Sequence, residues 1–192
     1  MKPAAWSTTH THLELFHGCL LFAARRIAVG VNPTVGNPST DFGRGFYTTT
    51  RLDQAEQWAR RVYRKTYPLK NPSDPPTIVK FVVPLDLLAS LNSLSFVRGD
   101  SSNAAFWSFV AHCRASGKVV RSHLHPDKRR APPNDWYDMI VGPVASWPPK
   151  RGHQYVLGSR NGMNFATYDQ FSFHTNAAAK ILNNPQLIPL KP

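Results

Sequence analysis

The stretch that most constrains the fold of this chain is residues 41–50, Asp-Phe-Gly-Arg-Gly-Phe-Tyr-Thr-Thr-Thr. Gly43 and Gly45 predict a tight turn at which the backbone approaches a neighbour or a ligand with no side chain in between. The aromatic and β-branched residues that follow are typical of a strand. The stretch therefore predicts a glycine turn that leads directly into a strand.

A helix is expected next, from Asp53, interpreted as its N-cap, to Lys65. Four apolar side chains recur at helical spacing and are expected to face the core: Ala55, Trp58, Ala59 and Val62. The basic side chains of this helix allow two interpretations, a solvated surface or contact with an anionic partner. The turn, the strand and the helix together are expected to bring Tyr47 and Trp58 to one cleft.

Similar patterns predict further strands and helices along the rest of the chain. The strands are expected at residues 13–18, 77–84, 135–145 and 168–175, and the helices at residues 103–116 and 176–182. The first of these helices is expected to bury Phe106, Trp107, Phe109, Val110 and Cys113. No internal repeat or domain boundary is visible. We therefore expect one α+β domain over residues 1–192, with residues 1–12 and 186–192 as loose ends.

The charge of the chain narrows the class of its partners. Lys and Arg number 23 and Asp and Glu 11, which gives a net charge of +12. Such a chain attracts phosphate-bearing partners, which include dinucleotides, nucleic acids and anionic membrane surfaces. An acidic antitoxin or immunity protein would also match this charge. The most basic stretch, residues 117–133, is expected to form a surface excursion.

Several other classes of protein are disfavoured. No window is apolar enough for a membrane helix, and residues 13–24 lack the basic start and cleavage site of a signal peptide. We therefore expect action in a cytoplasm, that of the producing cell or of a target cell. Cys19 and Cys113 lack metal-ligand spacing and are expected to be free thiols, with one disulfide as the alternative. His123 and His125 have no nearby partner residue, so no metal is expected.

Five short motifs then occur in order along most of the chain. They are His-Gly at His17, Asp-Phe-Gly-x-Gly-Phe-Tyr-x-Thr at Asp41, Gln-Ala-x-x-Trp-Ala at Gln54, Tyr-Asp-x-x-x-Gly-Pro-Val-Ala at Tyr137 and Gln-x-Ser-Phe-His-Thr at Gln170. The set resembles the ADP-ribosyltransferase superfamily, on its diphtheria-toxin and poly(ADP-ribose) polymerase side. It resembles more closely an uncharacterised bacterial toxin-type domain family assigned to that superfamily. That branch places a second aromatic residue eleven positions after its tyrosine, as Trp58 follows Tyr47 here.

The resemblance implies a split β-sheet core with an NAD cleft, flanked by helices, and NAD as co-substrate without a metal. In this interpretation His17 hydrogen-bonds the ribose, the Gly18 backbone holds the carboxamide, and Tyr47 and Trp58 sandwich the nicotinamide ring. The other residues assigned to NAD binding are Asp41, Arg44, Gly45, Phe46 and Thr48. For three of them a structural role stays open: Asp41 capping the turn, Arg44 facing solvent and Thr48 supporting the strand.

The chain departs from this branch at the position of its catalytic glutamate, where it has Gln170. A full charge about 4 Å from the developing ribose cation is worth about 4 kcal/mol at an effective dielectric constant near 20, and glutamine carries none. Three solutions stay open. Gln170 suffices with help from elsewhere, Asp169 or Asp138 takes the role of the glutamate, or the domain binds NAD and cleaves it poorly.

These observations predict an NAD-dependent mono-ADP-ribosyltransferase that acts on a protein or nucleic acid, of the bacterial toxin or effector type, with His17, Tyr47 and Gln170 as its catalytic residues. The first alternative is an NAD glycohydrolase toxin. The second is a basic binding module, without enzyme activity, on a degenerate transferase scaffold. Gln170 and the basic stretch at residues 117–133 favour this second alternative.

Overall fold

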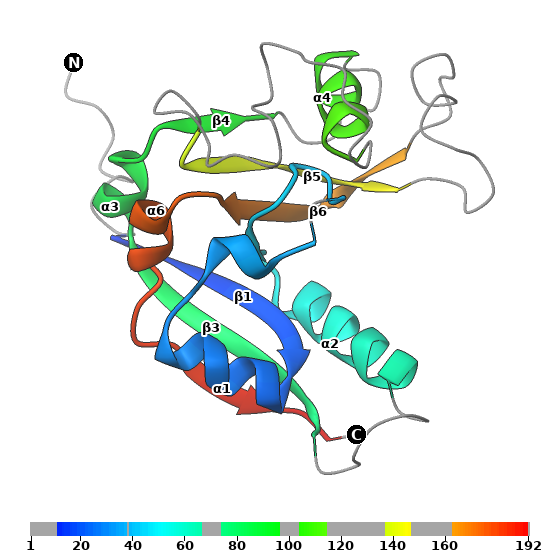
Figure 1. Cartoon of the computed structure of the whole chain (residues 1–192), viewed down its shortest axis with the longest axis vertical. Helices are drawn as coiled ribbons and strands as arrows, with labels where there is room; N and C mark the ends of the chain where they lie inside the picture. Colours follow the sequence, from blue (N-terminus) through cyan, green and yellow to red (C-terminus); the bar gives the residue numbers. More distant parts are fainter. Residues whose placement is uncertain are drawn as a thin grey trace, which may run out of the picture. The chain divides into compact units, whose positions relative to one another are not determined.

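The computed structural model describes residues 11–37, 39–66, 74–96, 104–114, 137–146 and 163–191. The fold is α+β, with two sheets and several helices (Figure 1). Its contacts divide the chain into two compact units, each described by itself below. The first unit comprises Met1–Val31, Thr48–Leu91 and Lys180–Pro192, and the second comprises Asn32–Tyr47 and Asn92–Ala179. The organisation as a single domain stays a prediction.

The first unit is built on an antiparallel three-stranded sheet in the order β1-β3-β7. Its strands are β1 (His12–Leu20), β3 (Pro76–Pro84) and β7 (Gln186–Pro189). Its helices are α1 (Leu21–Val29), α2 (Leu52–Thr66) and the short α3 (Leu85–Ala89), and both α1 and α2 lie against the sheet (Figure 1). The core between β1, β3 and α2 consists of Phe16, Ile78, Ala55 and Ala59.

The second unit holds most of a four-stranded sheet in the order β2-β6-β5-β4. Its strands are β2 (Phe46–Thr48), β6 (Met163–Phe173), β5 (Met139–Ser146) and β4 (Ser93–Ser95), with Thr48 already counted in the first unit. Strands β5 and β6 are antiparallel and lose register between Pro143 and Val144, next to the pairs Pro143–Asp169 and Gly142–Gln170. The 3-10 helix η2 (Pro33–Val35) and helices α4 (Ala104–Arg114) and α6 (Asn176–Lys180) complete the described elements of this unit.

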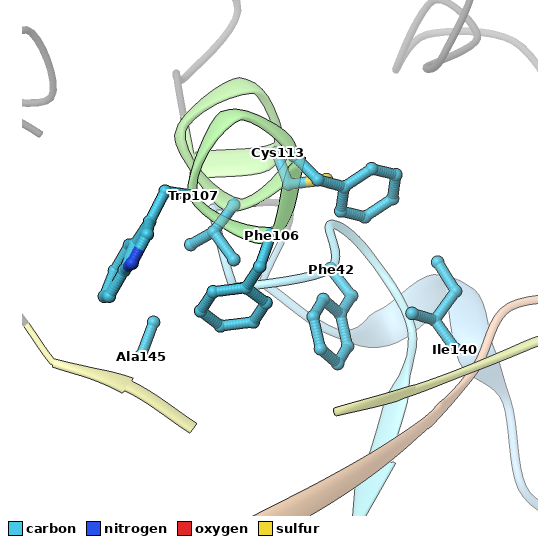
Figure 2. Packing of buried hydrophobic residues seen from close by; sticks show 8 residues of the cluster. Phe42, Phe106, Trp107, Cys113, Ile140 and Ala145 are labelled. Carbon is cyan, nitrogen blue, oxygen red and sulfur yellow. The ribbon is translucent and has the colours of Figure 1, made fainter. Parts of the chain in front are cut away.

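Phe42 is the centre of the second unit's core. Figure 2 shows its ring beside that of Phe106 below α4, and the two centroids lie 6.4 Å apart in an edge-to-face arrangement. The ring centroids of Phe96 and Phe109 lie 5.9 and 6.2 Å from that of Phe42. The α4 residues that the sequence predicts to be buried are all buried, as expected: Phe106, Trp107, Phe109, Val110 and Cys113.

Three expectations are wrong at the level of single elements. Residues 186–192 are not entirely loose, because residues 186–189 form β7 on the edge of β3. Helix α2 begins at Leu52, so Asp53 lies in its first turn and is not the N-cap. Trp58 shares the helix face of the buried Ala55 and Ala59 but is 53% exposed, whereas its spacing predicts a core position.

The expectations for the cysteines, the basic stretch and a membrane helix have different outcomes. Cys19 and Cys113 are free and buried, as the sequence predicts. The basic stretch at residues 117–133, with His123 and His125, lies outside the described residues. Among the described helices, none is long and apolar enough to cross a membrane.

Candidate functional site

Gly18 is packed directly onto the backbone of helix α2. A Cβ atom at this position would lie 2.1 Å from the Ala55 carbonyl oxygen and 2.9 Å from the Ala59 amide nitrogen. Only glycine allows a strand and a helix to approach so closely. The small side chains of Ala55 and Ala59 permit the same approach from the helix, which explains the alanines in the motif that begins at Gln54.

The same strand forms a second backbone contact at Phe16. The Phe16 N–H donates to the Thr49 carbonyl over 2.8 Å, and the Thr49 N–H donates to the Phe16 carbonyl over 2.9 Å. This isolated antiparallel bridge joins the His-Gly motif to the end of the Asp41 motif. Its register places Thr48 opposite His17.

The bridge also fixes the direction of the Gly18 peptide groups. Peptide groups two residues apart in a strand point to the same edge, so the Gly18 N–H and C=O point away from β3, as those of Phe16 do. Gly18 is buried, and no residue that the structure describes forms a hydrogen bond with either group. Buried peptide groups without a partner are rare, and this pair offers one donor and one acceptor side by side.

Thr49 also positions the start of α2. Its hydroxyl accepts a hydrogen bond from the Arg51 N–H and donates one to Gln54 Oε1, both over 3.1 Å. Helix α2 then carries Trp58 on the face that meets Gly18, with the Arg61 guanidinium 5.5 Å from the centre of the Trp58 ring. Four predicted site residues therefore belong to the first unit: His17, Gly18, Thr48 and Trp58.

In the second unit, Asp41 is the centre of a buried polar network. Its Oδ1 accepts hydrogen bonds from the Nε of Arg114, over 2.7 Å, and from Nη2 of the same guanidinium. Its Oδ2 accepts one from the Ala145 N–H, over 2.8 Å, and one from Gln170 Nε2, over 2.7 Å. Asp41 and Gln170 are 5% and 8% exposed, so the network is shielded from water. Asp41 therefore does more than cap its own turn.

Tyr47 fastens the glycine turn through its hydroxyl. The hydroxyl donates to the Gly43 carbonyl over 2.7 Å and accepts from the Phe42 N–H and the Thr40 hydroxyl over 3.0 and 2.8 Å. Gly43 has φ 80°, a conformation that favours glycine. Burial raises the pKa of Tyr47 far above its ordinary value of about 10. The hydroxyl therefore stays protonated and serves as a clamp, and the ring is what Tyr47 can offer a ligand.

Gly45 is held by a histidine that the site prediction did not include. His174 Nδ1 lies 2.8 Å from the Arg44 carbonyl oxygen, and its Nε2 lies 2.8 Å from Ser172 Oγ. A Cβ atom at Gly45 would meet this imidazole at 3.0 Å, so glycine is needed here for packing. His174 belongs to the motif that begins at Gln170, and this motif is the sequence signal by which His174 could have been included in the site. Phe46 follows as a buried residue of β2.

The two alternatives to Gln170 have other surroundings. Asp138 Oδ2 accepts a hydrogen bond from the Asn92 N–H over 3.2 Å, and its Oδ1 accepts one from the Thr175 hydroxyl. Asp169 is 1% exposed and directly precedes Gln170 in β6, so its side chain lies on the opposite face of the strand. Gln170, by contrast, donates directly to Asp41 Oδ2. In the part of the chain that the structure describes, no cluster of His, Cys, Asp and Glu side chains could hold a metal.

A protein-family model described as "Protein of unknown function (DUF3990)" matches residues 13–147. This is most of the chain. The chain belongs to this family. The DUF3990 match includes the His-Gly motif, the turn at Asp41 and Arg114, and it ends before Gln170. No curated protein and no solved structure matches the chain.

Proposed function

We propose that this member of the DUF3990 family is an NAD-dependent mono-ADP-ribosyltransferase that modifies a macromolecule, as a bacterial toxin or effector. The observation that carries the proposal is the pair of buried peptide groups at Gly18, which no described residue hydrogen-bonds. A carboxamide such as that of nicotinamide has one N–H₂ donor and one C=O acceptor, the complement of this pair. The five ordered motifs agree with this assignment.

The resemblance to ADP-ribosyltransferases assigns roles to four further residues. Cleavage of the bond between nicotinamide and ribose develops positive charge on a ribose carbon, so the enzyme holds the leaving ring still and braces the sugar. His17, beside Gly18 in β1, is assigned to a ribose hydroxyl. Tyr47 and Trp58 are assigned to the faces of the nicotinamide ring. Gln170 is assigned to a second ribose hydroxyl, as an acceptor without charge.

The charge of the chain bears on the acceptor and on partners. A net charge of +12 favours an acidic protein or a nucleic acid as the acceptor, and an acidic antitoxin or immunity protein as a neutralising partner. The exposed Trp58 and Arg61 on α2 add a surface of the kind that such partners contact. The cytoplasm, of the producing cell or of a target cell, supplies the NAD.

The test is release of nicotinamide from labelled NAD by the purified chain, with a cell extract as the source of acceptors. His17→Ala and Gln170→Ala are expected to lower the rate at least about tenfold, as loss of a transition-state contact does. His12→Ala is the matched control, because His12 is exposed and lies at the far end of the same strand.

The outcomes separate the alternatives. Label transferred to protein or nucleic acid supports the transferase. Free ADP-ribose without a labelled acceptor selects the NAD glycohydrolase. No release of nicotinamide by the wild type would overturn both and leave the non-enzymatic binding module.

A further inference from the structure

The orientation of the Gln170 amide is fixed by its two partners. Nε2 donates to Asp41 Oδ2 over 2.7 Å and to the Pro143 carbonyl oxygen over 2.9 Å. Both partners are oxygens that only accept, because Asp41 is ion-paired with Arg114 and the other group is a carbonyl. If the amide were rotated by half a turn, Oε1 would face both oxygens, and acceptors would meet acceptors. Oε1 must therefore point away from the network.

Among the residues that the structure describes, Oε1 is therefore a buried acceptor without a donor. Gln170 is 8% exposed, and no described residue donates a hydrogen bond to its Oε1. A buried carbonyl oxygen without a donor is costly, so the position suits a hydroxyl supplied from outside the protein. The register shift of β5 and β6 begins after the pair Pro143–Asp169, one pair away from Gln170, and such irregularities often adjoin active sites.

The network also gives a physical reason for glutamine at this position. A glutamate would bring a second carboxylate to 2.7 Å from Asp41 and would leave the Pro143 carbonyl without its donor. Like charges at this distance repel strongly. Its two hydrogen bonds to Asp41 place Arg114 at Oδ1, the oxygen of Asp41 that does not face Gln170.

We propose that Asp41 and Arg114 are positioning residues that hold the Gln170 amide with Oε1 directed at a ribose hydroxyl of NAD. Arg114 holds Asp41 through Oδ1 and also donates to the Ala145 carbonyl over 2.9 Å. Asp41 then holds the Gln170 amide through Oδ2. The proposal rests on the proposed function for the identity of the ligand, whereas the chain of contacts stands on the structure.

The first test variant is Asp41→Asn. Asp41 accepts on both oxygens, so an amide in its place opposes either the Arg114 guanidinium or the two donors at Oδ2. We expect the Gln170 amide to turn or detach. The kcat for nicotinamide release should fall about tenfold or more, with the KM for NAD changed less than about twofold. Arg114→Lys keeps the charge but not the paired donors, and serves if Asp41→Asn does not fold.

The control is Val110→Ala, which removes core volume from α4, the helix that carries Arg114, and removes no hydrogen bond of the network because the Val110 side chain is apolar. It should lower the thermal midpoint and leave kcat within about twofold of the wild type. A kcat that survives Asp41→Asn, or that falls equally in Val110→Ala, would overturn the positioning role.

A second readout does not depend on activity. The side-chain amide resonances of Gln170, identified as those absent in Gln170→Ala, should exchange slowly in the wild type. They should lose protection about tenfold or more in Asp41→Asn and keep it in Val110→Ala. Unchanged protection in Asp41→Asn contradicts the proposal. Lost protection in a protein that never releases nicotinamide supports the contacts and rejects the proposed function alone.

Discussion

Gly18 of β1 and Ala55 of α2 lie so close that one added carbon atom at Gly18 would stand 2.1 Å from the Ala55 carbonyl oxygen. The obstacle is the backbone of a helix, which cannot turn aside as a flexible side chain can. A substitution at Gly18 therefore tests how closely β1 and α2 pack.

Gly18→Ala is therefore expected to destabilise the protein by about 3 kcal/mol, the upper part of the usual range for overpacking. Urea denaturation measures the change in the free energy of unfolding. Gly30→Ala is the matched control, since a Cβ atom there has nothing within 4 Å, and it should stay within about 1 kcal/mol of the wild type. Equal stability of the two variants would contradict the close packing.

Tyr47→Phe removes the hydroxyl that fastens the glycine turn and keeps the ring. We expect a loss of about 1–3 kcal/mol, because the Phe42 N–H loses its partner and the Gly43 carbonyl keeps only the Thr40 hydroxyl as a side-chain donor. Nicotinamide release should survive in Tyr47→Phe and be lost in Tyr47→Ala, if the ring is what contacts the ligand. A Tyr47→Phe variant as stable as the wild type would show that the clamp is unimportant.

The raised pKa of Tyr47 makes its contribution depend on pH. Above pH 10 the unfolded tyrosine loses its proton while the folded one keeps it, so the folded state binds more protons and stability falls as pH rises. The fall should reach about 0.8 kcal/mol at pH 10.5 and be absent in Tyr47→Phe. Urea midpoints at pH 8 and pH 10.5 measure it. If the stability of the wild type and of Tyr47→Phe changed equally with pH, the Tyr47 hydroxyl would be exposed to water in the folded protein.

Both cysteines should be inert in the folded protein. Burial, followed by the negative charge of Asp74, raises the pKa of Cys19 to about 12, and Cys113 is fully buried. Ellman's reagent at pH 8 should therefore titrate neither thiol until guanidinium unfolds the chain, and then both. One thiol that reacts at once in the native protein would contradict this. A chain with no thiol after unfolding would indicate the disulfide.

Gln170→Glu should destabilise the protein by about 2 kcal/mol or more at pH 8, through repulsion from Asp41. The loss should shrink toward pH 5, because Asp41 raises the pKa of the introduced carboxyl and the folded state then binds its proton more tightly. Adding Asp41→Asn should restore part of the stability at pH 8. Gln186→Glu, on exposed β7, should change stability by less than about 0.5 kcal/mol at either pH. A loss of stability that does not change with pH would mean that the missing donor to the Pro143 carbonyl, and not repulsion from Asp41, destabilises the variant.

Much of the fold follows from local patterns. The alternating and β-branched runs at residues 13–18 and 77–84 are seen as β1 and β3, and the apolar positions of α4 are buried as their spacing predicts. Such patterns are visible because the residues that share a face are close in sequence. Strand β7 was missed, since four residues that pair with a distant strand leave almost no local signal.

The candidate site was predicted less completely. The sequence indicated that Asp41, Gly43 and Gly45 matter, but not why, because the partner of Asp41 is Arg114, 73 positions away. Trp58 was misplaced, because a tryptophan at helical spacing has the same pattern in a core and on a surface beside a cation. The role of the Tyr47 hydroxyl depends on the backbone conformation of residues 40–43. A turn of this kind has no periodic sequence pattern from which it could be predicted.

Strand β7 has a consequence for how the protein is made. It completes the sheet of the first unit by pairing with β3 over Thr77–Lys80, more than a hundred residues earlier in the chain. During synthesis, β1 and β3 therefore emerge from the ribosome with an open edge that has no third strand until about a hundred further residues are translated. Pairing over such a separation is slow, so the nascent first unit should depend on chaperones to keep that edge from joining other chains.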